Sequence, residues 1–377
     1  MKKFLKGFLY TILTIIVLFS GYALVTGKMY LFKAVWHNFA DIDDYKIFTN
    51  NTVKTGQPKP WVEAGKMNAI PYSAELNSDL ERLSTVGLLM VKNDSIVFEK
   101  YWDGYSDTSK SGSFSMAKSI TSLLIGAAIH DGLIKGVNEP VSDFLPEFNE
   151  GEKAKVKIVD LLTMSSGSNW DESYANPLSV TTELYYGSDV YKTATGVAIT
   201  TTPGTEHRYK SGDTQLLGLI VEKATGKSLS DYAAEKLWQP LGAQQPALWS
   251  TDHEGGYEKA YCCFNSNVRD FARIGKLMLD SGKINGVPVI DSAYFANSIK
   301  QCNIPDPSGR PCKYYGYQWW IDPLHPEIFY ARGILGQYII VIPQKKMVIV
   351  RLAKKSGSKV NTVPEEVRWL IDWGLAS

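Results

Sequence analysis

The stretch SGSFSMAKSITSLLIGAAIHDGLI, residues 111–134, places a serine and a lysine at the start of a long apolar segment. Lys118 is the only lysine, arginine or carboxylate between Ser115 and Asp131. Small and apolar residues fill the rest, which favours a helix from Ser115 to about His130 that stops at the Asp-Gly turn. A lysine there has little packing value, which points to chemistry.

Ser115 and Lys118 are three residues apart and would share one face of that helix. Burial lowers the pKa of a lysine because it disfavours the charged ammonium, so the amine of Lys118 can accept the hydroxyl proton of Ser115. Unpaired N–H groups at a helix N-terminus also favour a developing oxyanion. The same spacing recurs at Ser356 and Lys359 in a loop, and an N-cap serine followed by a solvated lysine is an ordinary helix start. The motif alone leaves both interpretations open.

Two later segments supply partners for this pair. Tyr209 follows a Pro-Gly turn and precedes an amphipathic helix, a position from which its phenol can meet Lys118. Gly336 begins a predicted strand, and its missing side chain would let a substrate approach the strand edge. The amide of Gln337 would then be the second oxyanion donor beside the amide of Ser115. We therefore predict Ser115, Lys118 and Tyr209 as catalytic residues.

The surrounding pattern predicts strands near both ends of the chain. Residues 87–102 form two β-rich runs around an Asn-Asp turn, which indicates a hairpin. Further β-rich runs between 315 and 353 precede a terminal helix at 364–375. Between about 125 and 300 the pattern is mainly helical with long loops. We predict one α/β domain in which both chain ends build an antiparallel sheet, flanked by helices, around an inserted helical region.

The first residues predict a membrane segment. Three lysines precede an uncharged apolar run from Gly7 to Gly27, which as a helix would span about 30 Å, roughly one hydrocarbon core. Lysines before the span favour a cytoplasmic N-terminus and an exported body, periplasmic or extracellular. A cleaved signal peptide is the alternative, although its apolar region is usually shorter. We assign residues 1–27 to this anchor or signal, 28–75 to a lead-in or stalk, and 76–377 to the main domain.

The balance of charge bears on the expected partners, and the cysteines and histidines bear on possible disulfides and metal sites. The 40 Lys and Arg residues balance 39 Asp and Glu residues without long blocks of one sign, so nucleic acid is not an expected partner. Cys302 and Cys312 flank a turn-rich segment of the exported part, where they either close a small disulfide loop or remain buried or free thiols. Cys262 and Cys263 are interpreted as packing residues. The histidines are scattered singly, so no metal site is predicted.

Six segments match a known enzyme superfamily in order and spacing: SMAKSITSLLIG, LLTMSSG, PGTEHRYKSGDTQLLG, LWQPLGA, RDFARIGKLML and GILGQYIIVIP. From about residue 80 to the end, the chain resembles the serine β-lactamase and penicillin-binding-protein superfamily, in its class C, D-Ala-D-Ala carboxypeptidase and esterase branch. Within that branch it is most similar to 6-aminohexanoate-dimer hydrolases. The resemblance implies a β-lactamase-like fold, no cofactor or metal, and an acyl-enzyme on Ser115. Lys118 would take the serine proton, and Tyr209 would serve the leaving group and the attacking water.

Two positions depart from the pattern of that superfamily. Ser211 stands where class C enzymes have the asparagine of Tyr-x-Asn, which shortens a contact to the substrate amide. Residues 334–336, Ile-Leu-Gly, stand in place of a third motif that reads Lys-Thr-Gly or His-Thr-Gly. The cation that recognises a substrate carboxylate is therefore missing at that position, and Arg332 and Arg351 are the candidates to replace it.

We expect hydrolysis of a linear amide or ester, in a small-molecule or peptide-like substrate, because the missing cation argues against an efficient β-lactamase or carboxypeptidase. Trp170, Asp171, Ser211 and Gly336 are the candidate substrate-binding residues, with core packing as the alternative for Trp170. An inactive relative that binds peptides or peptidoglycan is the second hypothesis, although a binding module need not keep the three catalytic residues. A Ser-His-Asp hydrolase ranks below both, since no Gly-x-Ser-x-Gly segment occurs.

Overall fold

A seven-stranded sheet forms the centre of the body, and strands from both ends of the chain build it. The structure is a computed structural model that describes residues 2–377. The strand order is β10-β11-β12-β13-β3-β4-β2, antiparallel except where β2 pairs with β4. The strands are β2 (Val62–Glu63), β3 (Thr85–Lys92), β4 (Ser95–Tyr101), β10 (Trp320–Ile321), β11 (Phe329–Gly333), β12 (Gln337–Ile342) and β13 (Met347–Ala353). The predicted hairpin and the predicted sheet from both chain ends are confirmed.

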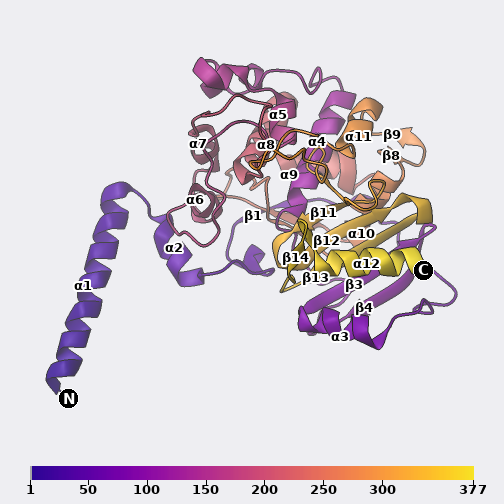
Figure 1. Ribbon diagram of the computed structural model, residues 1–377, viewed down its shortest axis with the longest axis horizontal. Coiled ribbons are helices and arrows are strands. Elements are labelled where there is room, and N and C mark those ends of the chain that lie inside the picture. The colour runs from indigo at the N-terminus through magenta and orange to yellow at the C-terminus, as the bar shows by residue number, and fades with distance from the viewer. Residues whose placement is uncertain (1) are drawn as a thin grey trace.

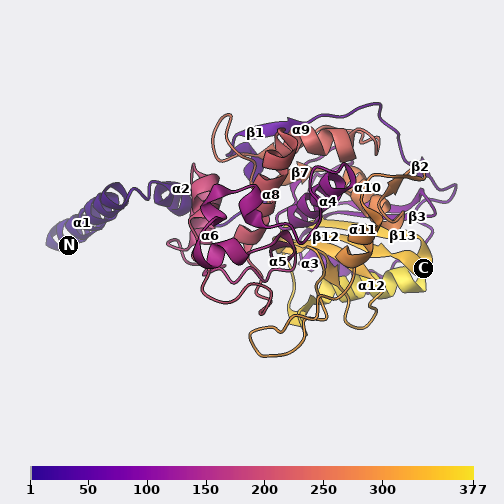
Figure 2. The ribbon, with the colours of Figure 1, turned by 90° about the horizontal axis from the view of Figure 1, so that it is seen from above.

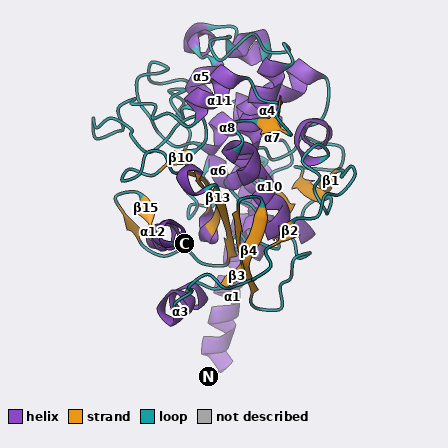
Figure 3. Cartoon of the chain, turned by 90° about the vertical axis from the view of Figure 1, so that its right-hand side faces the viewer, coloured by secondary structure: helices purple, strands orange, loops and turns teal. Residues whose placement is uncertain are grey.

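Helices cover both faces of this sheet (Figures 1 and 3). Helix α10 (Val268–Leu279) packs on one face, and α3 (Ala74–Arg82) and α12 (Glu365–Ala376) cover the other. Side chains alternate between the two cores along each strand: on β12, Ile339 joins the core under α10, and Ile340 joins the core under α12. The central strands are therefore apolar on both faces, which explains their continuous runs of Val, Ile and Leu.

The middle of the chain is mainly helical, as predicted, and two long helices pack against each other at its centre (Figure 2). These are α4 (Met116–His130) and α8 (Ser211–Thr225), both largely buried. The shorter helices are α5 (Ile158–Leu162), α6 (Val180–Tyr186), α7 (Val190–Thr195), α9 (Leu229–Ala233) and α11 (Ser292–Ser298). The bounds of α4 agree with the helix that the opening stretch predicts.

A second sheet, which the sequence did not predict, lies beside these helices. Its order is β1-β6-β7-β5. Its strands are too short to show an alternating pattern in the sequence. They are β1 (Asn50–Val53), β5 (Ser111–Gly112), β6 (Ala247–Ser250) and β7 (Phe264–Ser266). Two small hairpins complete the structure, formed by β8 (Lys283–Ile284) with β9 (Val287–Pro288), and by β14 (Lys359–Val360) with β15 (Val363–Pro364). Because β1 and β2 belong to the lead-in segment, that segment pairs with both larger sheets.

Helices α1 (Lys2–Thr26) and α2 (Tyr30–His37) precede the body, and α1 projects away from it (Figures 1 and 2). The run Lys3–Thr26 contains an 18-residue window with a mean hydropathy of 2.2 and is long and apolar enough to cross a membrane. Helix α2 docks on α6, and an ion pair between Lys28 and Glu183 (3.2 Å) supports the contact. Only the end of α1 next to α2 therefore rests against the body.

Candidate active site

Ser115 and Lys118 lie where the chain turns from β5 into α4. Phe114, the residue before the serine, has a left-handed φ of 43°, an unusual conformation for an aromatic residue that is typical of constrained functional turns. The Nζ of Lys118 lies 3.0 Å from the Oγ of Ser115 and donates further hydrogen bonds to the Oγ of Ser211 (3.1 Å) and the carbonyl of Tyr261 (2.9 Å). Burial lowers the pKa of this amine to about 8. The structure therefore places a partly neutral amine within proton-transfer distance of a hydroxyl.

Tyr209 approaches the same pair from the loop that enters α8. The Nζ of Lys118 lies 5.1 Å from the centroid of its ring. Burial, and then the charge of Glu172, raise the pKa of the phenol above its ordinary value, although the contact with Ser115 opposes the shift. The ring packs against Trp320, with 5.6 Å between centroids. The phenol thus remains protonated near neutral pH and can donate a proton.

A carboxylate that sequence reasoning missed, Glu172, joins this network. It accepts hydrogen bonds from the backbone N–H and the Oγ of Ser211 (both 2.6 Å), from the hydroxyl of Tyr174 (2.5 Å) and from the Nε1 of Trp170 (2.9 Å). Burial lowers the pKa of Lys118, and the negative charge of Glu172 partly opposes that effect. The only signal in the sequence is its place beside Trp170 and Asp171, two candidate substrate-binding residues. Nothing in the local sequence shows which side chain of this loop turns inward.

The predicted substrate-binding residues of this loop lie elsewhere. Trp170 is buried with its ring against Gly212, where an added Cβ would come within 2.3 Å of the indole, so Trp170 packs the entrance of α8. Asp171 is exposed, and its carboxylate accepts a hydrogen bond from a backbone amide of its own turn. Ser211, in contrast, borders the cavity beside Ser115. The structure therefore brings Ser211 to the site and leaves Trp170 and Asp171 outside it.

The second oxyanion donor also differs from the prediction. Strand β11 ends at Gly333 against the turn that holds the serine: a Cβ there would meet the carbonyl oxygen of Ser113 at 2.2 Å. The next residue, Ile334, lines the same cavity as Ser115. Gln337 is fully buried, and its side chain is hydrogen-bonded to the backbone of β13. The strand end that faces the serine is thus Gly333, so the amide of Ile334, and not that of Gln337, is the candidate donor.

Gly336 is a packing residue. The two candidate cations near it, Arg332 and Arg351, have different surroundings. Its φ is +88°, and an added Cβ would meet the guanidinium of Arg351 at 2.1 Å, so it faces the sheet interior and not a substrate. Arg351 is fully buried and donates to backbone carbonyls, which marks it as structural. The guanidinium of Arg332 stacks 4.5 Å from the ring centroid of Trp320. Its charge reaches the phenol of Tyr209, where it weakly opposes the effect of burial on that pKa.

A cavity of about 480 Å³ opens beside Ser115. Its polar residues include Ser115 and Ser211, and most of its wall consists of aromatic and aliphatic side chains from α2, from the loop before α6 and from the turn after β11. A larger and more open groove of about 690 Å³ runs between α2 and α7, and neither Ser115 nor Lys118 lines it. The smaller cavity is therefore the one that can hold a substrate against the serine.

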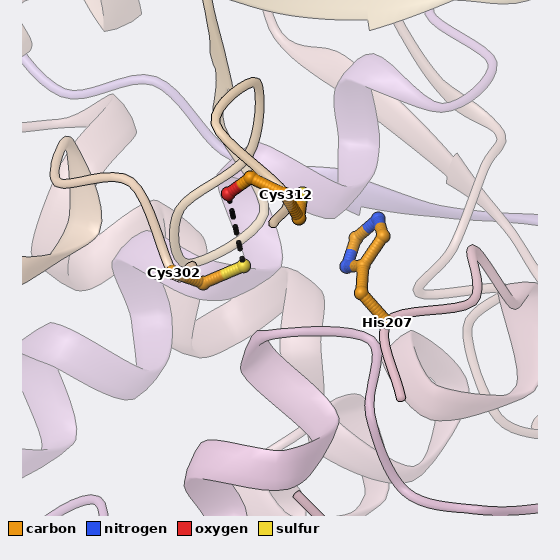
Figure 4. Close-up of side chains that lie close together, drawn as sticks. All are labelled: His207, Cys302 and Cys312. Atoms are coloured by element: carbon orange, nitrogen blue, oxygen red, sulfur yellow. Dashed lines mark hydrogen bonds between the residues drawn. The ribbon is translucent and has the colours of Figure 1, made fainter. Parts of the chain in front are cut away.

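The cysteines depart from the prediction. A disulfide bond joins Cys262 to Cys263, which had been interpreted as packing residues, and Cys302 and Cys312 are free thiols. Of the two alternatives left open for Cys302 and Cys312, the structure has the free thiols, and the Sγ of Cys302 lies 3.8 Å from the carbonyl oxygen of Cys312 (Figure 4). His207 completes a cluster whose donor atoms lie within 4.8 Å of one another. The sequence showed this histidine as isolated because the three residues meet only through the fold.

Comparison with known proteins places this geometry in a family. The family model described as beta-lactamase matches residues 76–371, and the chain belongs to that family. A 6-aminohexanoate-dimer hydrolase of Paenarthrobacter ureafaciens is 26% identical over 296 residues, which are 74% of this chain and 75% of the relative. The fold and the resemblance that the sequence predicted are thereby confirmed.

Solved structures share the fold at low sequence identity. A Bacillus anthracis protein assigned as a 6-aminohexanoate-dimer hydrolase superposes with a TM-score of 0.72 at 22% identity, covering 89% of this chain and 91% of that one. A family VIII carboxylesterase superposes with a TM-score of 0.64 at 16% identity, covering 84% of this chain and 98% of that one. The same architecture thus occurs in proteins named as a 6-aminohexanoate-dimer hydrolase and as a carboxylesterase.

Proposed function

We propose that this protein is a serine hydrolase that cleaves a linear amide or ester through an acyl-enzyme on Ser115. The observation that carries the proposal is the 3.0 Å contact between the buried amine of Lys118 and the hydroxyl of Ser115, at the edge of a cavity. With a pKa of about 8, the amine is neutral in about a tenth of the molecules at pH 7. A base with a pKa this close to the operating pH combines a populated neutral form with enough basicity to accept the serine proton.

In the acylation step, the Oγ of Ser115 bonds to the substrate carbonyl carbon while its proton moves to the Nζ of Lys118. The amides of Ser115 and Ile334 would stabilise the oxyanion, and within residues 2–377 the Ser115 amide has no other acceptor. Collapse of the intermediate breaks the bond to the leaving group, which takes a proton from Tyr209, and Lys118 returns one to Tyr209. Water then attacks the acyl-enzyme, loses a proton along the same path, and Ser115 is released with its proton restored.

Ser211 and Glu172 support the base in this scheme. The hydroxyl of Ser211 accepts a hydrogen bond from Lys118 and donates one to Glu172, so the carboxylate acts on the amine through one hydroxyl. Burial alone would make the ammonium costly, and the negative charge offsets part of that cost when Lys118 holds the serine proton. Glu172 is therefore a positioning residue that tunes the pKa of the base.

We further propose that α1 anchors the protein in a membrane with the catalytic domain outside the cytoplasm. Three lysines precede the apolar run, which is the charge arrangement of a cytoplasmic N-terminus. Only 6% of the apolar window of α1 is buried, so the body covers little of this helix beyond its end next to α2. A membrane would cover it.

Two alternatives share the same cleft. A peptide-binding relative without activity would not need a base in contact with the serine, and this contact favours the enzyme. A D-Ala-D-Ala carboxypeptidase or β-lactamase would need a cation for the substrate carboxylate. Arg332 is the one candidate that lies near Tyr209, but its guanidinium is already engaged by the ring of Trp320 and the carbonyl of Thr362.

The test is covalent labelling of the full-length chain in detergent with a fluorophosphonate, read by intact-mass spectrometry. We expect one adduct on the wild type, none on Ser115→Ala, and one on the matched control Ser113→Ala, whose hydroxyl bonds only to the carbonyl of Phe114. Ser115→Ala should also lose turnover of short esters by several orders of magnitude while keeping its fold. An unlabelled wild type, or full turnover in Ser115→Ala, would contradict the proposal.

A further inference from the structure

The catalytic cavity is partly walled by the segment that joins the apolar helix α1 to the body. Val35 of α2 and Phe39, just after this helix, line the same cavity as Ser115. Only three residues separate the end of α1 from the start of α2, which allows a reach of about 14 Å at most. Helix α2 directly follows α1 (Figures 1 and 2), so wherever α1 crosses a membrane, α2 lies at its surface. One wall of the cavity lies there with it, because Val35 and Phe39 line the cavity.

The two sides of α2 have different surroundings. One side is buried against α6 through Tyr30, Leu31 and Ala34. The other side leaves large apolar side chains open: the exposed fractions are 84% for Trp36 and 75% for Phe39, and Phe32 and Val35 are exposed as well. A short helix with one docked side and one aromatic, apolar side suits the boundary between lipid headgroups and acyl chains. This side of α2 continues into the cavity wall through Val35 and Phe39.

The position of Tyr209 indicates which half of a substrate enters the cavity. Tyr209 serves the leaving group in the proposed reaction, and it does not line the cavity, since its ring packs toward Trp320. The alcohol or amine half of the substrate therefore lies on the side of Tyr209. The acyl half extends from Ser115 into the apolar space that ends at α2.

We propose, resting on the hydrolase function above, that the substrate is an acyl ester of a membrane amphiphile and that its hydrocarbon chain lies in this cavity. The chain reaches Ser115 from the bilayer past the exposed side of α2. The step is the hydrolysis already described: the ester bond breaks, one water is consumed, and a carboxylic acid and an alcohol are released. Each methylene that enters the cavity leaves water, which should raise kcat/KM by about two- to fourfold.

The experiment uses the full-length protein in vesicles of diether phosphatidylcholine, whose lipids contain no carboxylic ester. p-Nitrophenyl esters from acetate to dodecanoate are added, and kcat/KM is measured against chain length. Val35→Asp and Phe39→Asp each place a carboxylate at the cavity wall, and both positions are exposed enough to keep the fold. Val287→Asp is the matched control, since it adds the same charge at an exposed apolar position of β9, which belongs neither to α2 nor to the cavity wall. Because long esters also partition into the bilayer, the difference between these variants is the readout.

We expect kcat/KM to rise with chain length in the wild type and in Val287→Asp. In Val35→Asp and Phe39→Asp we expect kcat/KM for the dodecanoate ester to be at least tenfold lower than in the wild type. A flat profile in the wild type, or the same slope in all four proteins, would overturn the acyl-chain proposal. Turnover of the acetate ester and the fluorophosphonate adduct do not depend on the cavity wall. Their absence would overturn the hydrolase function, and this proposal with it.

Discussion

Lys118 and Lys259 are both buried in the body, and burial lowers the pKa of both amines, to about 8 and about 7 respectively. Lys118 contacts the hydroxyl of Ser115 at the edge of a cavity. Lys259 donates to the carbonyl of Tyr185 (2.7 Å) and lies 3.4 Å from the ring centroid of Phe48. The comparison teaches that a lowered pKa records burial. It becomes a catalytic property only where the amine shares a hydrogen bond with a nucleophile that a substrate can reach.

The sharpest test of this difference replaces each lysine by methionine, which keeps the length of the side chain. Lys118→Met removes the base, and kcat/KM for a short ester should fall by about 10³-fold or more. Lys259→Met removes an amine that serves no hydroxyl, so kcat/KM should stay within about threefold of the wild type. Steady-state hydrolysis of p-nitrophenyl acetate measures both.

Circular dichroism of the two methionine variants is the control for folding. Equal losses of activity in two folded variants would show that burial of the amine, and not its contact with Ser115, determines its effect on activity. A folded, fully active Lys118→Met would remove Lys118 from the mechanism.

The pH dependence of activity separates the two lysines further. Only neutral Lys118 can accept the serine proton, so kcat/KM should rise with pH up to about 8 and then level off. Glu172 favours the ammonium, so Glu172→Gln should lower the pKa of Lys118 and move the acidic limb to lower pH. Lys259→Met should leave the limb in place. Profiles of kcat/KM from about pH 5 to 10 measure these shifts.

Stability must be followed beside that profile. Glu172 accepts several hydrogen bonds that an amide cannot fully replace, so Glu172→Gln should lower the free energy of unfolding by about 1 to 3 kcal/mol. The position of the limb, not the size of the rate, is therefore the readout. A limb at the wild-type pH in a folded Glu172→Gln would show that the carboxylate acts only as a structural acceptor.

The parts of this molecule that could be predicted are those that local pattern determines. The apolar run after Ser115 sets the extent of α4, and the β-rich runs set the central sheet. Residues 334–336 were less informative, because β11 and β12 pair Gly333 with Gln337 across them, and the pattern does not show which side of this tight connection faces the serine.

Loop residues were harder still, since Glu172 and Asp171 are equivalent acids until the packing of α8 selects one. The disulfide between Cys262 and Cys263 was missed for the same reason. Neighbouring residues in sequence form the disulfide, and the distant pair meets a histidine from a third segment. Contacts of this kind form only in the folded chain, and the spacing of residues in the sequence does not reveal them.

The smallest expected effect concerns two arginines that differ as the two lysines do. Arg351 is buried in the sheet core, whereas Arg332 is half-buried beside Trp320 near Tyr209. Arg332→Gln should raise KM by less than about tenfold for an ester that carries a carboxylate, and leave a neutral ester within about twofold, because an engaged, partly solvated guanidinium contributes little to binding.

The same engagement of Arg332 predicts that nitrocefin is turned over slowly by the wild type, and no more slowly by Arg332→Gln. Absorbance assays with matched charged and neutral esters, and with nitrocefin, decide this. Rapid nitrocefin turnover that depends on Arg332 would mean that the guanidinium leaves the ring of Trp320 to bind a carboxylate. The site would then recognise substrates by charge as well as by the apolar cavity.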